Sequence, residues 1–292
     1  MSDNGRGRVD TLGIAAQFPD LQDLTLLAQG AQKVVFAAKH VEEGDVVLKL
    51  LLQESGNARL DREILAGRLV GCERVPTIHE TGTLSTPLRD CTWVREERVH
   101  GTTLRTCLNS GPVGIEGVIH LGRQVLKILC ASEQRRIVHR DIKPENIMRD
   151  QSGEFWLLDF GLARHLDLES LTATHQHFGV GTPGYSAPEQ MRNKKRQIDT
   201  RADLFALGIT MYEYGTGSNP FIDGARDPLE ILRRVESLVL PAFNVAGDPS
   251  DSLRDLVAAL TQKYPTQRPR TAQETQVWLE DIARQMTADV SN

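Results

Sequence analysis

The period of the hydrophobic pattern changes near residue 100, and this change constrains the fold more than any other feature. Before it, KVVFAAKH (33–40) and VVLKLLL (46–52) flank turn residues, which predicts an antiparallel hairpin. One stretch with helical spacing, 57–70, lies among these strand-like segments. Beyond Gly101, apolar residues recur at helical spacing in five stretches: 114–137, 203–217, 227–239, 252–263 and 271–285. The pattern predicts an α+β chain with a small β-rich lobe that holds one main helix, followed by a larger and mostly helical lobe.

Length and composition allow one bilobal unit or two domains, since 292 residues with 40% hydrophobic side chains can bury a large core. The polar start of the chain predicts a flexible tail over residues 1–20. We expect the folded region to cover 21–284, with lobes at about 21–98 and about 99–284. A C-terminal tail is expected over the remaining residues, 285–292.

Charge and cysteine usage exclude several classes of partner. The net charge of −5 gives no electrostatic reason to bind nucleic acid or an anionic membrane, and we expect the basic run at 192–197 to be a solvated loop. The four cysteines form no CxxC pair, which predicts free thiols in a reducing compartment. No run approaches the roughly 18 to 20 apolar residues of a membrane span. The sequence therefore predicts a cytoplasmic protein that binds neither nucleic acid nor membrane.

A series of motifs in fixed order carries the strongest signal. It consists of VVLK (46–49), LDREIL (60–65), IVHRDIKPENIM (137–148), LLDFGLAR (157–164), GTPGYSAPEQ (181–190), DLFALG (203–208) and QRPRT (267–271). In this order the motifs resemble the catalytic domain of eukaryotic-like serine/threonine protein kinases, over roughly residues 24 to 283. The resemblance implies the bilobal protein-kinase-like fold.

The resemblance also implies a phosphoryl-transfer site that uses ATP and Mg²⁺. In that site Asp141 orients the substrate hydroxyl and accepts its proton, while Lys143 reaches the γ-phosphate as a point charge. Asn146 and Asp159 hold the magnesium ions, which call for oxygen ligands. The hydroxyl of Thr182 is expected to contact Asp141 and Lys143.

Other positions take supporting roles in this resemblance. Lys49 holds the α- and β-phosphates and pairs with Glu63, so Lys49→Met is expected to reduce transfer by orders of magnitude and to leave the fold intact. Glu189 pairs with Arg268 as a purely structural contact. His139 packs and forms hydrogen bonds beside the metal-binding segment.

The stretch AQGAQKVVF (28–36) raises the question of whether the first hairpin is an ordinary one or a phosphate loop. Aligned on Val35, the three glycines of the family's phosphate loop correspond to Ala28, Gly30 and Lys33. Gly30 would let the backbone approach the phosphates, and Lys33 adds a cation unless its side chain simply points to solvent. The positions expected to bind the nucleotide are Ala28, Gly30, Lys33, Val35, Val47, Lys49, Glu63, Glu97, Val99 and Met148.

Two further departures from the family pattern concern activity. Glu96 falls at the back of the adenine pocket, where an apolar residue is usual. A buried carboxylate there is costly unless it is paired, so either Glu96 pairs or the register is off by one. Gly67 replaces a bulky apolar residue that normally packs toward Phe160, which would loosen the helix that carries Glu63.

The segment between Asp159 and Pro188 suggests a switch. Arg140 directly precedes Asp141, and in kinases with that arrangement the arginine commonly pairs with a phosphorylated residue of the activation segment. Thr172 and Thr174 are the favoured candidates for autophosphorylation. The alternative is that these hydroxyls only keep the loop solvated.

The function implied is an ATP- and Mg²⁺-dependent kinase that phosphorylates serine and threonine hydroxyls of protein substrates. Lys143 together with GTPGY favours serine/threonine over tyrosine as the acceptor. The alternative is a pseudokinase scaffold or nucleotide-binding module of the same fold with little or no phosphoryl transfer. The physiological substrate, the activating signal and the oligomeric state do not follow from the sequence.

Overall fold

The computed structural model describes residues 11–30, 33–52, 71–85, 90–159, 181–194, 197–245, 248 and 251–289. The described residues fall into two compact units. The first, called the sheet unit here, takes its residues from 1–57 and 76–98, and the second, the helical unit, from 58–75 and 99–292. The expected division into a small β-rich lobe and a larger helical lobe is confirmed. The helix expected at 57–70 lies outside the described residues.

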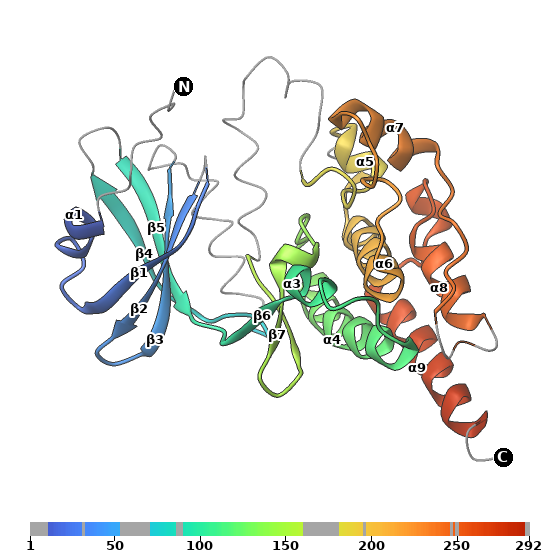
Figure 1. Ribbon diagram of the computed structural model, residues 1–292, viewed down its shortest axis with the longest axis horizontal. Coiled ribbons are helices and arrows are strands. Elements are labelled where there is room, and N and C mark those ends of the chain that lie inside the picture. Colours follow the sequence, from blue (N-terminus) through green and yellow to red (C-terminus); the bar gives the residue numbers. More distant parts are fainter. Residues whose placement is uncertain are drawn as a thin grey trace. The chain divides into compact units, whose positions relative to one another are not determined.

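The sheet unit contains a five-stranded antiparallel sheet with the strand order β1-β2-β3-β5-β4 (Figure 1). Its strands are β1 (Leu21–Gln29), β2 (Lys33–His40), β3 (Gly44–Leu51), β4 (Ile78–Ser85) and β5 (Asp90–Glu97). The hairpin predicted at 33–52 is the β2–β3 pair, in which Phe36 lies opposite Leu48. That prediction is confirmed.

The strand register sorts the side chains of the sheet onto two faces, because successive residues of a strand point to opposite sides. One face is apolar and buried; its members on β2 and β3 are Val34, Phe36, Ala38, Val46, Leu48 and Leu50. Directly opposed residues share a face, so Val35, Lys49 and Val94 lie together on the other side, and Val47 lies there with Glu96. The second face therefore carries a lysine and a glutamate among valines.

Part of the expected N-terminal tail is structured. Thr11–Ala15 form helix α1, which packs beside β1 (Figure 1). Phe18 is buried and meets the ring of Trp93 edge to face, with 5.2 Å between the ring centroids. The expectation of a flexible tail over 1–20 is thus wrong for residues 11–20, because Ile14 and Phe18 are spaced to bury one face against the sheet. Residues 1–10 lie outside the described residues.

The helical unit contains a small antiparallel sheet, strand order β6-β7-β8, and a set of packed helices. Its elements are β6 (Gly101–Thr103), α3 (Leu104–Leu108), α4 (Ile115–Gln134), η1 (Pro144–Asn146), β7 (Ile147–Asp150), β8 (Phe155–Leu157), α5 (Pro188–Met191), α6 (Thr200–Thr216), α7 (Pro228–Ser237), α8 (Ser252–Leu260), η3 (Pro265–Gln267) and α9 (Ala272–Asp289). The five helices predicted after residue 100 correspond to α4, α6, α7, α8 and α9. Helix α9 continues to Asp289, which corrects the expected start of a C-terminal tail at 285.

Helix α4 packs against both α6 and α9 in the core of the helical unit (Figure 1). Gly122 of α4 permits this close approach. A Cβ atom at that position would lie 2.8 Å from a methyl carbon of Leu279 and 3.1 Å from the terminal methyl of Met211. Helix α6 is buried on almost every side, so the polar residues that it carries must find partners inside the protein.

The expected pair of Glu189 and Arg268 is confirmed and lies inside the helical unit. The two side chains are 2% and 0% exposed, and the Nη1 atom of Arg268 lies 2.7 Å from Oε1 of Glu189. A second bond of 3.0 Å joins Nη2 to Oε2. Arg268 also donates to the backbone carbonyls of Arg201 and Gln262. The pair therefore ties α5 to the segments that flank α6 and α8.

Removal of one member of this pair should lower the free energy of unfolding far more than removal of both. Glu189→Ala leaves the guanidinium of Arg268 buried without its countercharge, and we expect a loss of about 3 to 5 kcal/mol in the free energy of unfolding. The double variant Glu189→Leu/Arg268→Met should recover a large part of that loss. Urea denaturation of the two variants and the wild type measures the effect, and equal stabilities for the wild type and Glu189→Ala would contradict it.

Candidate active site

The conformation of the segment that leads to Asp141 is held by a buried carboxylate of α6. Asp203 accepts the backbone N–H of His139 at 2.8 Å and that of Arg140 at 2.7 Å. Burial raises the pKa of Asp203, and the nearby histidine and the two N–H bonds act in the opposite direction. Arg140 adopts a left-handed backbone conformation with φ of 68°. Asp203 thus fixes an uncommon turn immediately before Asp141.

Sequence reasoning quoted DLFALG as a motif but assigned Asp203 no role. The signal was present, because Asp203 is an acidic residue in a helix that carries apolar residues on nearly all sides. A buried carboxylate needs hydrogen-bond donors, and a turn with two free N–H groups supplies them.

His139 connects this turn to the strand that precedes Asp159. Its side chain is fully buried, its Nδ1 atom accepts the N–H of Asp141 at 3.2 Å, and its Nε2 atom lies 2.8 Å from the carbonyl oxygen of Leu158. Because Nδ1 accepts, Nε2 carries the proton and donates it to Leu158. The expected packing and hydrogen bonding of His139 beside the metal-binding segment is confirmed.

The carboxylate of Asp141 is the centre of a polar cluster. Its Oδ1 atom accepts the hydroxyl of Thr182 at 2.6 Å, and its Oδ2 atom contacts Nζ of Lys143 at 2.7 Å and Nδ2 of Asn146 at 2.9 Å. Lys143 also donates to Oγ1 of Thr182 at 2.6 Å. The structure therefore brings together four residues that were singled out from the sequence, and the expected contact of Thr182 with Asp141 and Lys143 is present.

Asn146 lies directly before β7 and Asp159 shortly after β8, so both lie at the open end of the β7–β8 hairpin. The N–H of Leu158 donates to the carbonyl of Asn146 at 2.8 Å, which holds the two ends together. The amide nitrogen of Asn146 is used by two bonds to Asp141, so its amide oxygen faces away from them as the remaining acceptor. An amide oxygen and a carboxylate are ligands that fit Mg²⁺, which usually takes one or two protein side chains together with phosphate oxygens.

The turn of the same hairpin is fixed by Asp150. Its carboxylate accepts Nε1–H of Trp156 at 2.8 Å, a guanidinium N–H of Arg74 at 3.1 Å, and N–H and hydroxyl groups of Ser152. Burial by itself raises the pKa of Asp150, but the hydrogen bonds from Ser152, Trp156 and the backbone lower it to about 2. The hairpin that carries Asn146 and Asp159 is thus braced at its turn by an ionised carboxylate.

The β1–β2 turn closes as an antiparallel hairpin. Ala28 lies opposite Val35, and the N–H of Gly30 donates to the carbonyl of Lys33 at 2.9 Å. A Cβ atom at residue 30 would lie 3.7 Å from the nearest atom, the carbonyl oxygen of Lys33, which is an ordinary contact. Among the described residues, the hairpin therefore gives no steric reason for a glycine at position 30.

Lys49 and Glu96 form an ion pair on the second face of the sheet. The Nζ atom of Lys49 lies 2.5 Å from Oε1 of Glu96, and the side chains are only 5% and 8% exposed. Lys49 lies opposite Val94 and Val47 lies opposite Glu96, so the pair is a diagonal one across neighbouring strands. Of the two alternatives stated for Glu96, the structure shows that it pairs.

The other predicted nucleotide positions are distributed over both units. Val35 and Val47 are half-buried on the face that carries Lys49, while Met148 and Val99 are half-buried in the helical unit. Glu97 uses its N–H to donate to the carbonyl of Thr77 at 2.8 Å. Glu63, Gly67, Phe160, Thr172 and Thr174 lie outside the described residues. The expectations for those positions stay predictions.

The comparison with protein families assigns the chain as a whole. The model described as protein kinase domain matches residues 21–278. The chain belongs to the protein kinase domain family. Among the described residues, no helix combines the length and the apolar character that a crossing of the bilayer requires.

The three curated relatives described here are bacterial. The chain is 30% identical over 253 residues to a probable serine/threonine-protein kinase of Clostridium perfringens. This match covers 85% of the chain and 36% of the relative. It is 32% identical over 263 residues to serine/threonine-protein kinase PknD of Mycobacterium tuberculosis (87% and 38%). It is 29% identical over 257 residues to serine/threonine-protein kinase PknB of Mycolicibacterium smegmatis (85% and 40%). The chain thus spans well under half the length of these relatives.

The ionised state of Asp150 should make its contribution to stability depend on pH. Its pKa is about 2 in the folded protein and about 3.9 in an unfolded chain, so the contribution is complete above pH about 4 and is lost as the pH falls toward 2. We therefore expect Asp150→Asn to lower the melting temperature near pH 6 and to have much less effect near pH 2.5. An equal difference in melting temperature at both pH values would contradict this account.

The ion pair changes what is expected of Lys49→Met. Sequence reasoning expected Lys49→Met to leave the fold intact, whereas this variant leaves the carboxylate of Glu96 buried without its ammonium partner. We expect a loss of about 3 to 5 kcal/mol in the free energy of unfolding for Lys49→Met. Lys49→Met/Glu96→Leu should restore most of it, because neither charge then remains buried. Urea unfolding measures both, and wild-type stability of the single variant would refute a structural role for the pair.

Proposed function

We propose that the chain is a serine/threonine protein kinase catalytic domain, which transfers the γ-phosphoryl group of ATP to hydroxyl groups of protein substrates. Membership of the protein kinase domain family and the printed names of its relatives support this activity. The geometry around Asp141 supports the assignment of the residues that carry it.

The hydrogen bonds of Asp141 carry the proposal. A carboxylate offers about four lone-pair positions, two on each oxygen. Lys143 and Asn146 use both positions on Oδ2, while Thr182 uses one on Oδ1. The remaining position on Oδ1 is where a substrate hydroxyl would donate its proton. Asp141 would orient that hydroxyl and accept the proton as the oxygen attacks phosphorus.

Positive charge near the transferring group would come from several sources. Lys143 contacts both Asp141 and Thr182, so it would lie beside the acceptor hydroxyl and contact the γ-phosphate. Asn146 and Asp159 would hold Mg²⁺, which would supply positive charge to the transferring group. In the sheet unit, Lys49 would contact the α- and β-phosphates, and Glu96 would fix the direction of its ammonium group.

The acceptor class, the location and the switch also belong to this proposal. Lys143 and the GTPGY segment favour serine and threonine as acceptors, in agreement with the names of the relatives. We place the domain in the cytoplasm, with proteins rather than nucleic acids as substrates. Arg140 would pair with a phosphorylated Thr172 or Thr174 and raise the activity after autophosphorylation.

Replacement of the proposed base tests the function. Asp141→Asn keeps the shape of the side chain but cannot accept the proton, so we expect transfer of radiolabelled γ-phosphate to a protein substrate to fall by about a hundredfold or more. The melting temperature should stay near that of the wild type.

Asp255→Asn is the matched control, because Asp255 is an exposed aspartate on α8, and its activity should equal that of the wild type. Wild-type turnover in Asp141→Asn would remove Asp141 from the mechanism. No transfer by the wild type to any substrate, under conditions where ATP binds, would refute the catalytic function itself.

A further inference from the structure

A cavity of about 210 Å³ lies in the helical unit between α8 and the segment that follows α7. Tyr212 of α6 lines it together with mainly apolar residues, among them Leu240, Phe243 and Val257. An engineered cavity of about 150 Å³ binds benzene, so this one has room for a ring or a short aliphatic chain and for one polar group in addition. All of its lining residues belong to the helical unit, and none of them is part of the proposed transfer site.

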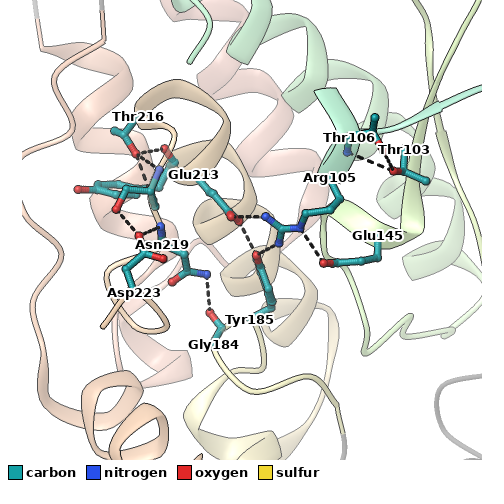
Figure 2. Close-up of polar contacts among 12 residues, drawn as sticks. Thr103, Arg105, Thr106, Glu145, Gly184, Tyr185, Glu213, Thr216, Asn219 and Asp223 are labelled. Atoms are coloured by element: carbon teal, nitrogen blue, oxygen red, sulfur yellow. Dashed lines mark hydrogen bonds and ion pairs between the residues drawn. The ribbon is translucent and has the colours of Figure 1, made fainter. Parts of the chain in front are cut away.

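Tyr212 brings a polar group without a partner to this cavity. The residue is 4% exposed, and no hydrogen bond of its hydroxyl group is found among the described residues. Its neighbour in the chain, Glu213, shows the usual state of a buried polar group, because it accepts from Arg105 and Tyr185 (Figure 2). Burial raises the pKa of Tyr212, so its hydroxyl keeps the proton and can donate. A buried tyrosine hydroxyl usually has a partner, and a ligand in the cavity can supply one.

Lys263 adds a cation that also lacks an acceptor. It lines the same cavity, and among the described residues its Nζ atom has no hydrogen-bond partner although it has almost no contact with solvent. The ammonium lies over the rings of Phe221 and Phe205, with 4.5 Å and 5.8 Å from Nζ to the ring centroids. These contacts replace hydration only in part, since burial and the nearby Arg268 lower the pKa of Lys263 to about 8. An anion would stabilise the charged form of this lysine.

The other charged side chain of the cavity, Arg254, is already paired. Its Nη1 atom lies 2.6 Å from Oδ2 of Asp251, and its Nη2 atom lies 3.2 Å from Oδ1 of Asp255. The cavity therefore offers a phenol O–H and an ammonium group as donors in apolar surroundings. The four-carbon stem of lysine is flexible, so the ammonium can turn from the rings toward a ligand. A carboxylate meets both donors, because it accepts on two oxygens and carries the opposite charge.

We propose that this cavity is a binding site for a small monocarboxylic acid with an aromatic or short aliphatic body. The body packs against Phe243 and Val257, and the carboxylate accepts from the hydroxyl of Tyr212 and from the ammonium of Lys263. The site is separate from the proposed transfer site, and its occupation is measured without phosphoryl transfer.

Fluorine NMR titration tests the site with two probes of the same shape. The probes are para-fluorophenylacetate and its neutral analogue para-fluorophenylacetamide. For the wild type at pH 7 we expect a saturable change of the fluorine signal with both probes. The carboxylate should bind about tenfold more tightly, which is the difference between a hydrogen bond to a charged group and one to a neutral group. The absence of saturable carboxylate binding to the wild type would overturn the proposal.

Two variants assign the donors. Lys263→Met keeps an apolar stem over the phenylalanine rings but removes the charge, so the two probes should bind equally. Tyr212→Phe removes only the hydroxyl, and both probes should bind about fivefold more weakly. If Lys263→Met does not fold, Lys263→Gln replaces it. A preference for the carboxylate that persists without the charge of Lys263 would contradict the assigned site.

Lys127→Met and Tyr264→Phe are the matched control variants. Lys127 is on α4 in an exposed ion pair with Glu73, and Tyr264 is 63% exposed and directly follows Lys263. Both control variants should bind the two probes as the wild type does. Carboxylate binding that Lys127→Met weakens as much as Lys263→Met would reduce the effect to general attraction by positive charge.

The pH dependence is a readout that a change in packing alone would not move. Lys263 loses its charge as the pH rises through about 8, and the raised pKa of Tyr212 keeps its hydroxyl protonated. The other charged groups near the cavity keep their charges between pH 7 and 9; they are Asp248, Asp251, Arg254, Asp255 and Arg268. Binding of the carboxylate should therefore weaken severalfold from pH 7 to pH 9, whereas binding of the amide should stay constant. Parallel pH profiles for the two probes would exclude Lys263 as the cation of the site.

Discussion

The carboxylate of Asp203 fixes the geometry on which the rest of the site depends. It lies inside α6 and accepts two successive backbone N–H groups, which forces the chain into a left-handed turn at Arg140 just before Asp141. An aspartate buried so completely is costly to ionise, and the cost is offset only if the donors stay in place. The two hydrogen bonds to Asp203 therefore stabilise the turn. The burial of Asp203 in turn depends on the turn, because the turn supplies these two donors.

From this turn, hydrogen bonds extend to several groups of the proposed transfer site within the helical unit. His139 links the turn to the strand before Asp159, Asn146 links the two ends of the β7–β8 hairpin to Asp141, and Thr182 joins the segment after residue 180 to the same carboxylate. Each side chain has its rotamer fixed by a second contact. Such support is what a site needs if catalysis depends on positioning and on charge rather than on covalent chemistry.

Buried and partly buried ion pairs recur among the described residues of this chain. Lys49 with Glu96 and Glu189 with Arg268 each place a cation against a carboxylate away from bulk water, and the more exposed Arg105 contacts the buried carboxylate of Glu213. Ion pairs of this kind add little net stability compared with apolar packing, but they are costly to break on one side only. These ion pairs therefore serve mainly to hold a charged side chain in one position.

The sequence by itself determined the order and type of the elements and the identity of the central residues. Periods of two and of 3.6 residues depend on neighbours along the chain, so the β2–β3 hairpin and helices such as α4 could be read directly. Asp141, Lys143 and Asn146 lie within one short segment and were identified by its resemblance to the catalytic loop of protein kinases. Alternation along β3 and β5 even restricts Lys49 and Glu96 to definite faces. It does not say which strands are neighbours, so the sequence offered pairing of Glu96 as one of two alternatives and named no partner for it.

Only the tertiary structure decided the contacts between residues far apart in the chain. Arg105 and Glu213 are separated by 108 positions, and His139 and Asp203 by 64. No local pattern marks either pair, because both depend on how α3 and the segment before Asp141 pack against α6. The N-terminal helix was missed for a related reason: its few apolar residues gain a fixed conformation only from burial against the sheet. The order of helices and strands could thus be predicted because it follows from local periodicity. The partners of Asp203, Glu96 and Arg105 follow from packing between distant segments, which no single stretch of the sequence specifies.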